Sequence, residues 1–531
     1  MSKIFDNSKT QKNNLACSEY CEQNTLLLND LEKQCYVIKT GNNIVLSEES
    51  KISSEDIFCI GIIPSMSLGS LGDKSFINDY GTKYAYMAGA MANAISSENM
   101  VIELGANGFL GSFGTGGVSK SQIEESICKI KSELPNGPYA FNLLHSPTDL
   151  KREFETVSVF LKHGIDIVEA SAYINISPAL VYYRISGLKQ SNDGEIQATH
   201  RVIAKISREE VALKFLQPAE KEIVEMLLQE KMITEEQAAL AEKIPMADDI
   251  TVEADSAGHT DNRPLVSILP AIISLRDSVQ KKYNYIKPVR IGAAGGISTP
   301  AAAIGAFQMG AAYIVTGSVN QACIESGTSD YVRKVLAEAK MADVMMAPCA
   351  DMFELGAKVQ VLKKGTMFPM NAQKLYEIYR KNSSLEELSS KEKEQLEKRI
   401  FKRNVDEIWI DVVKYFNSID KNVIIRAESD KRHKMALIFR WYLGNSSRWA
   451  VKGIADRYMD MQIWCGQAMG AFNSWVQNTY LEEVQNRKVA DVAFHIMNGA
   501  TYIFRINLAE FMGVSVPIEL KSYRPDKPFC A

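Results

Sequence analysis

Short hydrophobic runs alternate with helical stretches between about residue 84 and residue 316 of the chain. Each run is apolar throughout, which is typical of strands in a parallel sheet that is covered on both faces. The expected strands are Tyr84–Ala88, Phe109–Phe113, Tyr139–Leu143, Ile165–Ala170, Val202–Ile206, Thr251–Ala254, Val289–Ala293 and Ala312–Thr316. The expected helices between them include Lys120–Glu133, Asp149–His163 and Pro300–Met309. Eight strand–helix units favour an α/β fold, a closed (β/α)₈ barrel over residues 81–345, rather than an open sheet.

Two segments are too long for the connections of a minimal barrel. Tyr173–His200 is an excursion before the fifth strand, and Ser207–Asp249 follows that strand. Within the second segment, Glu220–Lys231 and Thr234–Lys243 have helical patterns with Glu-rich starts. We therefore expect residues 207–249 to be a helical insertion that caps the barrel mouth.

The regions on either side of the barrel have different patterns. Residues 1–14 are polar, lack the apolar core of a signal peptide and predict a disordered tail. Residues 15–80 predict a small N-terminal module, in which Cys35–Leu46 has the pattern of a hairpin around Gly-Asn-Asn. Residues 346–531 predict a helical C-terminal domain. Its notable stretches are Ala372–Tyr379, Ser384–Phe401, Asn404–Tyr415, the Met-, Trp- and Gly-rich Arg457–Tyr480, and Asn486–Met497.

The composition narrows the class of protein. No apolar run reaches the roughly 18 residues that span a bilayer, and a net charge of −4 argues against nucleic acid as the main partner. The nine cysteines include no C-x-x-C pair, and Cys17 and Cys21 are followed by no second ligand pair. This usage fits free thiols in a reducing compartment and predicts no disulfide framework and no metal site. We therefore expect a cytoplasmic protein with no membrane and no nucleic-acid partner.

Charge and tryptophan are unevenly distributed. Residues 371–450 carry 17 Lys+Arg and 12 Asp+Glu, a balance of +5 in a chain whose total is −4. The five tryptophans all lie in the C-terminal third, at Trp409, Trp441, Trp449, Trp464 and Trp475. These two shifts support a separate C-terminal domain.

Two small-residue loops follow the last two expected strands. Small residues there leave backbone N–H groups free to face an anion, and a pair of such loops is the usual phosphate site of this fold. The alternative is that the glycines only form tight turns. The residues of the two loops are Gly292, Ala294, Gly295, Gly296, Gly317 and Ser318.

Other strand ends offer groups that suit a flat ring. Gly89, Ala90 and Met91 follow the first strand, and the small residues Gly89 and Ala90 would let a ring lie against the backbone. Asn142 offers an amide for a pyrimidine-type edge, and Lys205 offers a cation near a ring carbonyl. The alternatives are core packing, helix capping and a surface ion pair. Together with the phosphate loops, these residues indicate flavin mononucleotide, FMN.

His259 is the candidate catalytic residue. It follows the sixth strand within Glu253-Ala-Asp-Ser-Ala-Gly-His259, among small and polar residues. A histidine at the C-terminal end of a barrel strand is catalytic by position, and its near-neutral pKa suits proton donation. His145 follows the third strand and could also approach the mouth.

Several motifs resemble the flavin-dependent TIM-barrel family that includes nitronate monooxygenases and flavin enoyl-acyl-carrier-protein reductases. Shared elements are Gly89-Ala-Met-Ala92, Gly108-Phe-Leu-Gly-Ser-Phe-Gly114, the Ser-Ala-Gly-His segment and Ala294-Gly-Gly-Ile. Met346-Ala-Pro-Cys-Ala-Asp-Met352 and Lys363-Lys-Gly-Thr-Met-Phe-Pro-Met370 narrow the resemblance to the trans-acting enoyl reductases of polyketide and polyunsaturated fatty acid synthases. One departure is Ala257, where the family usually has glycine. If that position requires φ > 0, alanine there would be strained.

The resemblance implies an activity and its partners. NADPH would reduce the flavin, which would pass a hydride to the β-carbon of an enoyl thioester on an acyl carrier protein, with His259 as acid or thioester donor. The +5 segment could dock an acidic carrier protein, although a solvated helical face is the simpler interpretation of its Lys–Glu alternation. Oligomeric state stays open, with a homodimer as one possibility.

Three other interpretations remain. A nitronate monooxygenase-like oxidase would share the flavin and the histidine. An inosine-monophosphate-dehydrogenase-like barrel would share the Gly-Gly loop but needs a cysteine where His259 stands. A non-catalytic carrier-docking barrel would need neither the phosphate loops nor His259.

Overall fold

The computed structural model describes residues 24, 26–41, 43–50, 57–146, 149–417 and 419–529. The expected tail at residues 1–14 and the Cys17–Cys21 pair lie outside the described residues. Eight parallel strands close into a barrel in the order β10-β11-β12-β13-β4-β5-β6-β7. Each overlaps one expected strand, so the predicted (β/α)₈ barrel is confirmed. The strands are β4 (Tyr86–Ala88), β5 (Leu110–Phe113), β6 (Ala140–Leu144), β7 (Ile167–Ser171), β10 (Arg201–Ile206), β11 (Asp249–Glu253), β12 (Arg290–Ala294) and β13 (Ile314–Thr316).

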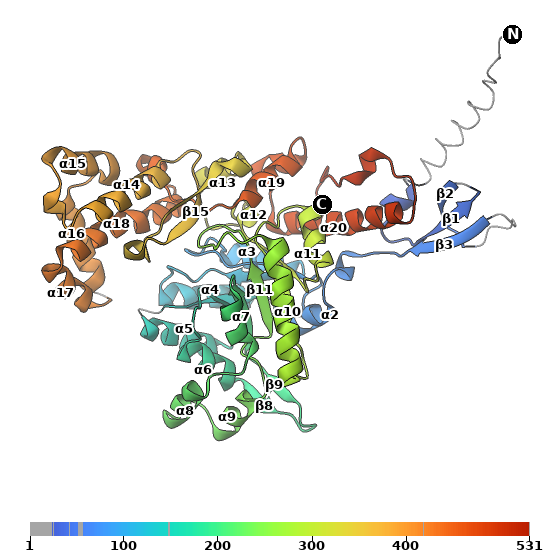
Figure 1. The fold of residues 1–531 in the computed structure, drawn as a ribbon, viewed down its shortest axis with the longest axis horizontal. Coiled ribbons are helices and arrows are strands. Elements are labelled where there is room, and N and C mark those ends of the chain that lie inside the picture. The colour runs from blue at the N-terminus through green and yellow to red at the C-terminus, as the bar shows by residue number, and fades with distance from the viewer. Residues whose placement is uncertain are drawn as a thin grey trace, which may run out of the picture.

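Helices surround this barrel (Figure 1). Local signals set their ends: Ser119 and Gln122 form a capping box at the start of α4, and Gly164 ends α5 with φ of 60°. The surrounding helices are α3 (Glu98–Ala106), α4 (Lys120–Glu133), α5 (Leu150–His163), α6 (Pro178–Ser186), α7 (Glu209–Leu216), α10 (Leu265–Tyr283), α11 (Pro300–Gln308), α12 (Ser318–Gln321) and α13 (Asp330–Ala337).

The N-terminal end of the barrel is closed by α2 (Lys74–Tyr80). Phe76 stacks on Tyr313, with ring centroids 4.3 Å apart. Beside them, Arg290 Nε lies 2.7 Å from Asp249 Oδ1, and both side chains are buried. Tyr80 donates its hydroxyl to the same carboxylate. The floor of the barrel is therefore an aromatic cluster built around one buried ion pair.

The helical insertion lies at the N-terminal end of the barrel, not over its mouth. It contains α8 (Lys221–Gln229) and α9 (Glu235–Ala241), which pack with α6 and the hairpin β8 (Leu188–Gln190)–β9 (Ile196–Ala198). In Figure 1 these elements lie at the end of the barrel away from the C-terminal helices. The expected cap is therefore wrong: these helices follow α7, which has already returned the chain to the start of the next strand.

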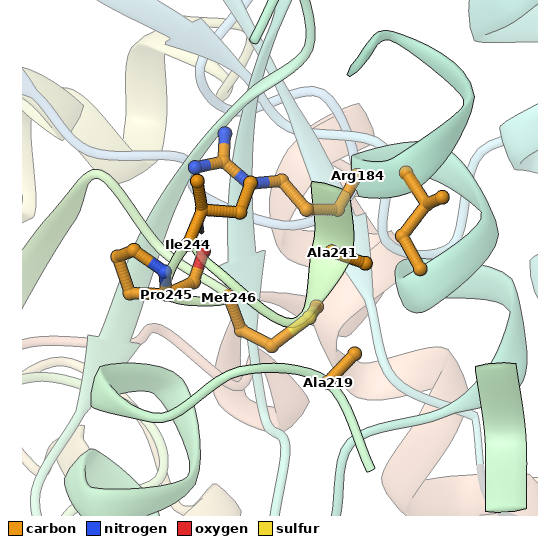
Figure 2. A pocket seen from close by; sticks show the side chains of 7 residues that line it. Arg184, Ala219, Ala241, Ile244, Pro245 and Met246 are labelled. Carbon is orange, nitrogen blue, oxygen red and sulfur yellow. Dashed lines mark hydrogen bonds between the residues drawn. The ribbon is translucent and has the colours of Figure 1, made fainter. Parts of the chain in front are cut away.

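A small hollow borders this insertion (Figure 2). Its only charged lining residue, Arg184, donates to Asp248 Oδ2 at 2.7 Å and to the His200 carbonyl at 2.8 Å. Because Arg184 is already paired with Asp248 and faces the N-terminal end of the barrel, this hollow is not part of the mouth. The lining residues are Arg184, Ile185, Ala219, Ala241, Ile244, Pro245 and Met246.

The N-terminal sheet has the order β2-β1-β3, from β1 (Cys35–Thr40), β2 (Asn43–Ser47) and β3 (Ile57–Ile63). The expected hairpin is present as β1 and β2, which pair antiparallel. The sheet packs against α20 (Val489–Phe511), from which buried Arg505 donates to the carbonyls of Leu27 and Lys33. The same helix packs along α11, so the end of the chain joins this sheet to the barrel.

Residues after 345 are mainly helical, with one antiparallel pair that the sequence pattern did not predict. This pair is β14 (Val344–Pro348) and β15 (Lys358–Leu362). None of the helices in the described ranges is long and apolar enough to cross a membrane. The remaining helices are α14 (Phe368–Lys381), α15 (Ser390–Gln395), α16 (Val405–Asn417), α17 (Lys421–Ser429), α18 (Lys431–Lys452) and α19 (Gln467–Val476).

Candidate active site at the barrel mouth

The C-terminal ends of the barrel strands face the segment that follows the barrel. Gly258 and Gln360 exchange two main-chain hydrogen bonds of 3.0 and 2.7 Å, which join the loop after β11 to β15. Gln360 Nε2 also donates to Asp255 Oδ1 at 2.9 Å. Gly466 N–H donates to Ser318 Oγ at 3.2 Å, which joins the segment before α19 to the loop after β13. Residues beyond the barrel therefore form part of its mouth, and β15, α12 and α19 lie above the barrel in Figure 1.

The two glycine loops border open space at this mouth. A Cβ placed on Gly296 or on Gly317 would meet no atom within 4 Å. Ser298, fully buried, has a hydroxyl with no hydrogen-bond partner among the residues that the structure describes. Ala294 is the last residue of β12. Gly292 lies apart, inside β12, where a Cβ would come within 2.4 Å of the Tyr313 ring.

Gly295 is held by its neighbours as well as by its backbone. Gly295 and Gly296 have φ of 84° and 76°. Gly295→Ala would place a Cβ 2.7 Å from the Ala254 carbonyl carbon, whereas Gly296→Ala would meet nothing within 4 Å. Positive φ costs alanine about 1–3 kcal/mol at either position, and the clash at Gly295 adds about 1–3 kcal/mol. We therefore expect Gly295→Ala to lower the thermal unfolding midpoint more, as measured by circular dichroism. Equal losses would contradict this account.

A buried carboxylate on β7 connects three of the expected ring-binding residues. Glu169 is 1% exposed, and its Oε2 accepts from the Ala90 N–H at 2.8 Å. Lys205 Nζ lies 3.9 Å from Glu169 Oε1 and 3.3 Å from Glu253 Oε1. Asn142 Nδ2 donates to the Glu169 carbonyl at 2.9 Å. The ion pair that was the alternative role of Lys205 is present, and it lies inside the barrel mouth rather than on the surface.

Two nearby carboxylates stabilise the ammonium group of Lys205. Burial lowers the pKa of Lys205, but Glu253 and Glu169 outweigh it and raise the pKa above its usual value, so the lysine is charged. Glu169 Oε1 has no hydrogen-bond partner among the described residues. A Cβ on Gly89 would lie 3.6 Å from that oxygen. A carboxylate oxygen without a hydrogen-bond donor and an ammonium group therefore lie beside the glycine where a ring was expected.

Met91 belongs to a close packing of two loops. Its N–H donates to Ser96 Oγ at 3.0 Å, and a Cβ on Gly114 would lie only 1.8 Å from the Met91 carbonyl oxygen. The last glycine of the Gly108–Gly114 motif thus allows the loop after β4 to lie against the loop after β5.

His259 lies at the edge of the mouth, next to residues that follow β14. Its Nε2 is 3.1 Å from Asp351 Oδ2, and the Cys349 thiol is beside both. Burial lowers the pKa of His259, but the hydrogen bond to Asp351 outweighs it and raises the pKa. The His259 and Asp351 side chains are 52% and 60% exposed, so water screens the attraction between them. The main effect of Asp351 is therefore to orient the imidazole ring. Positive φ falls on Gly258 and not on Ala257, so Ala257 carries no such strain.

Three contributors to this mouth were missed from the sequence: Glu169, Cys349 and Asp351. For Glu169 the signal was a single acidic residue within the apolar strand Ile-Val-Glu-Ala-Ser. Cys349 and Asp351 stand in Met346–Met352, a motif that was recognised without a role for its side chains.

Comparisons with known proteins agree with this geometry. The family model for the inserted helical domain of [acyl-carrier-protein] S-malonyltransferase matches residues 382–461. The crystal structure of the enoyl reductase domain of MlnA, from the macrolactin cluster of Bacillus amyloliquefaciens, is 41% identical and has a TM-score of 0.80. The match covers 84% of this chain and 100% of that domain.

Two larger proteins are also similar. A polyunsaturated fatty acid synthase subunit from Thraustochytrium sp. is 49% identical over 453 residues, which cover 84% of this chain and 30% of the Thraustochytrium protein. Polyketide biosynthesis protein PksE of Bacillus subtilis is 46% identical over 429 residues, which cover 81% of this chain and 56% of PksE. The chain thus spans less than a third of the Thraustochytrium protein and about half of PksE. Since it matches the whole MlnA domain at this identity, the chain belongs to the family of enoyl reductase domains of polyketide and polyunsaturated fatty acid synthases.

Proposed function

We propose that the chain is an FMN-dependent enoyl reductase that uses NADPH to reduce the α,β-double bond of enoyl thioesters on an acyl carrier protein. The observation that carries this proposal is the convergence of three features at one barrel mouth: open glycine loops, the Lys205–Glu169 cluster, and His259. The names of the relatives support the enoyl thioester as substrate.

The residues at the mouth fit a flavin with a phosphate tail. Gly296 and Gly317 border open space, as a backbone anion site requires, Gly295 precedes Gly296 in the same loop, and Ser318 and Ser298 add hydroxyls. The ring would lie next to these loops, from the loop after β4, the neighbour of β13, to the strands β6, β7 and β10. There the residues that would hold it are Gly89, Ala90, Met91, Asn142, Lys205 and Glu169. When bound, FMN supplies hydride transfer between the nicotinamide and the β-carbon of the substrate.

His259 acts as the proton donor in this proposal. Reduction adds a hydride to the β-carbon and a proton to the α-carbon, and negative charge develops on the thioester oxygen between these events. His259 is half exposed at the mouth, so its ring is open to a substrate that binds there. Asp351 accepts from His259 Nε2 and so leaves Nδ1 as the nitrogen that faces substrate.

The segment after the barrel supplies the remaining elements of the proposal. The Trp464 ring lies within 3.8 Å of a Cβ placed on Gly258, next to His259, where it would border an acyl chain. The +5 balance of residues 371–450 suits an acidic carrier protein, and the family model that overlaps them, at residues 382–461, comes from an enzyme that acts on carrier proteins. A homodimer is compatible with this arrangement.

One assay separates the proposal from its runner-up. The flavin-loaded protein is mixed with NADPH and crotonyl-carrier protein, and NADPH consumption is compared with oxygen uptake in the presence of a nitroalkane. We expect thioester-dependent NADPH consumption. Nitroalkane-dependent oxygen uptake without thioester reduction would favour the nitronate monooxygenase-like oxidase. A colourless protein that cannot be loaded with flavin would favour a non-catalytic docking module.

Asp351→Ala is expected to slow the enoyl half-reaction by up to about fivefold, because an exposed ion pair contributes about 0.2–1 kcal/mol. The change should appear in kcat rather than in KM, and reduction of the flavin by NADPH should keep its rate. Asp351→Glu, which retains the carboxylate, should recover most of the loss. A loss that Glu does not rescue, or that also affects flavin reduction, would contradict a positioning role.

A further inference from the structure

The side chains around His259 form a group that could bind a metal ion as well as donate a proton. His259 contributes an imidazole nitrogen, Cys349 a thiol and Asp351 a carboxylate, and these ligand atoms all lie within 4.8 Å of one another. The His259–Asp351 pair is 3.1 Å apart and more than half exposed, whereas Cys349 is 2% exposed. A surface ion pair needs no thiol, so Cys349 distinguishes this group from an ordinary pair.

Two loops hold the group in place. The loop that carries His259 is fixed to β15 by the Gly258–Gln360 main-chain hydrogen bonds. The loop that carries Cys349 and Asp351 is fixed by a hydrogen bond of 3.1 Å from the Cys349 N–H to the Ala357 carbonyl. Because the backbone on both sides is tied to the same hairpin, the three ligands stay close when an ion is absent.

We propose that His259, Cys349 and Asp351 form a site for a zinc-class divalent cation, and that the bound ion blocks proton donation by His259. A nitrogen, a sulfur and an oxygen donor are a set that Zn²⁺ accepts, whereas Mg²⁺ and Ca²⁺ require oxygen ligands. Zn²⁺ bond lengths of about 2.0–2.3 Å place tetrahedral ligands roughly 3.3–3.8 Å apart. The His259–Asp351 separation is 3.1 Å, and the separations within the group, at most 4.8 Å, exceed this range by no more than about 1 Å.

Three protein ligands leave a fourth position for water, and the half-exposed His259 gives the ion access. The ion would take the place of the proton on His259 Nε2, the nitrogen that now bonds Asp351. The imidazole would then be neutral, and its remaining Nδ1–H would be too weak an acid to protonate the substrate. The inhibitory effect therefore rests on the proposed function, but ion binding does not. The ligands come from segments about ninety residues apart, so cysteine spacing in the sequence could not reveal the site.

The test begins with binding to the flavin-loaded full chain, measured by competition with a chromophoric chelator for Zn²⁺. We expect one ion that depends on this group, with micromolar or tighter affinity. Cys349→Ala should weaken its binding by at least about 100-fold, more than loss of an outer-shell partner costs. Cys59→Ala, which removes an exposed thiol on β3, is the matched control and should change nothing. Unchanged affinity in Cys349→Ala, or no binding, would overturn the site.

Inhibition is measured separately. Zn²⁺ should slow oxidation of the reduced protein by enoyl thioester, a chelator should restore the rate, and Cys349→Ala should keep its own rate when Zn²⁺ is added. Binding without inhibition would overturn the link to His259 while leaving the ion site intact. A protein that binds Zn²⁺ but reduces no thioester would instead refute the proposed function.

Discussion

His259→Ala is expected to retain bound flavin and its reduction by NADPH, but to reduce enoyl thioesters about 10²–10⁴ times more slowly, the range that a positioned acid contributes. The two half-reactions separate because His259 pairs with Asp351 and is not among the residues that would hold the cofactor. Stopped-flow absorbance follows each half-reaction: bleaching by NADPH, then recovery of colour on addition of crotonyl-carrier protein.

His145→Ala is the matched control for this experiment. His145 also follows a barrel strand, but its Nδ1 lies 3.1 Å from Glu153 Oε2, and only 11% of its side chain is exposed. We expect its variant to recover colour at the wild-type rate. If His259→Ala did so as well, His259 would not be the proton donor. If His145→Ala alone lost the second half-reaction, the assignment would move to His145.

The barrel could be predicted from the sequence because its signal is local. Each strand of a parallel sheet is buried on both faces, so each appears as a continuous apolar run wherever it lies in the chain. The position of the insertion was predicted wrongly, although the order of the elements along the chain indicates the correct end of the barrel. Loops at the mouth lie between a strand and the helix that follows it, whereas α8 and α9 come after α7.

The sequence predicted those residues of the candidate site that lie at the end of a single strand. Gly295, Asn142, Lys205 and His259 each follow or end an expected strand, and the structure brings them to one mouth. Gly292 belongs to the same glycine-rich run, but the strand continues through it, and its missing side chain makes room for the Tyr313 ring. Spacing along the chain does not distinguish a glycine that packs from one that borders a ligand.

Contacts between distant segments could not be predicted. Asp351 reaches His259 because Gly258 and Gln360 form a main-chain bridge, and residues one hundred positions apart give no sign of such pairing. The β14–β15 hairpin that makes the bridge possible begins with Val-Met-Met-Ala-Pro, a run with few β-branched residues. The site thus depends on the β14–β15 pair, which the local sequence pattern does not predict.

Asp249→Ala is expected to lower the free energy of unfolding by about 3 kcal/mol, the lower end of the cost of removing one partner of a buried ion pair, because Asp79 still pairs with Arg290. Asp249 is fully buried at the barrel floor and accepts from Arg290 Nε at 2.7 Å and Nη2 at 2.8 Å. Its loss leaves the guanidinium bonded only at Nη1, to Asp79 and Ser75. Circular dichroism during urea unfolding is the suitable measurement, because all five tryptophans lie in the C-terminal third and would not report on the floor.

Two further variants decide whether the pair or merely its volume matters. Asp249→Leu combined with Arg290→Met removes both charges and keeps apolar bulk beside Phe76 and Tyr313, so it should recover much of the loss. Glu394→Ala removes the partner of Lys398 in an exposed helical pair and should have no measurable effect. If the double variant were as unstable as Asp249→Ala, the floor would depend on packing around these side chains. The stability lost in Asp249→Ala could then not be attributed to the charge of Arg290 that loses its Asp249 partner.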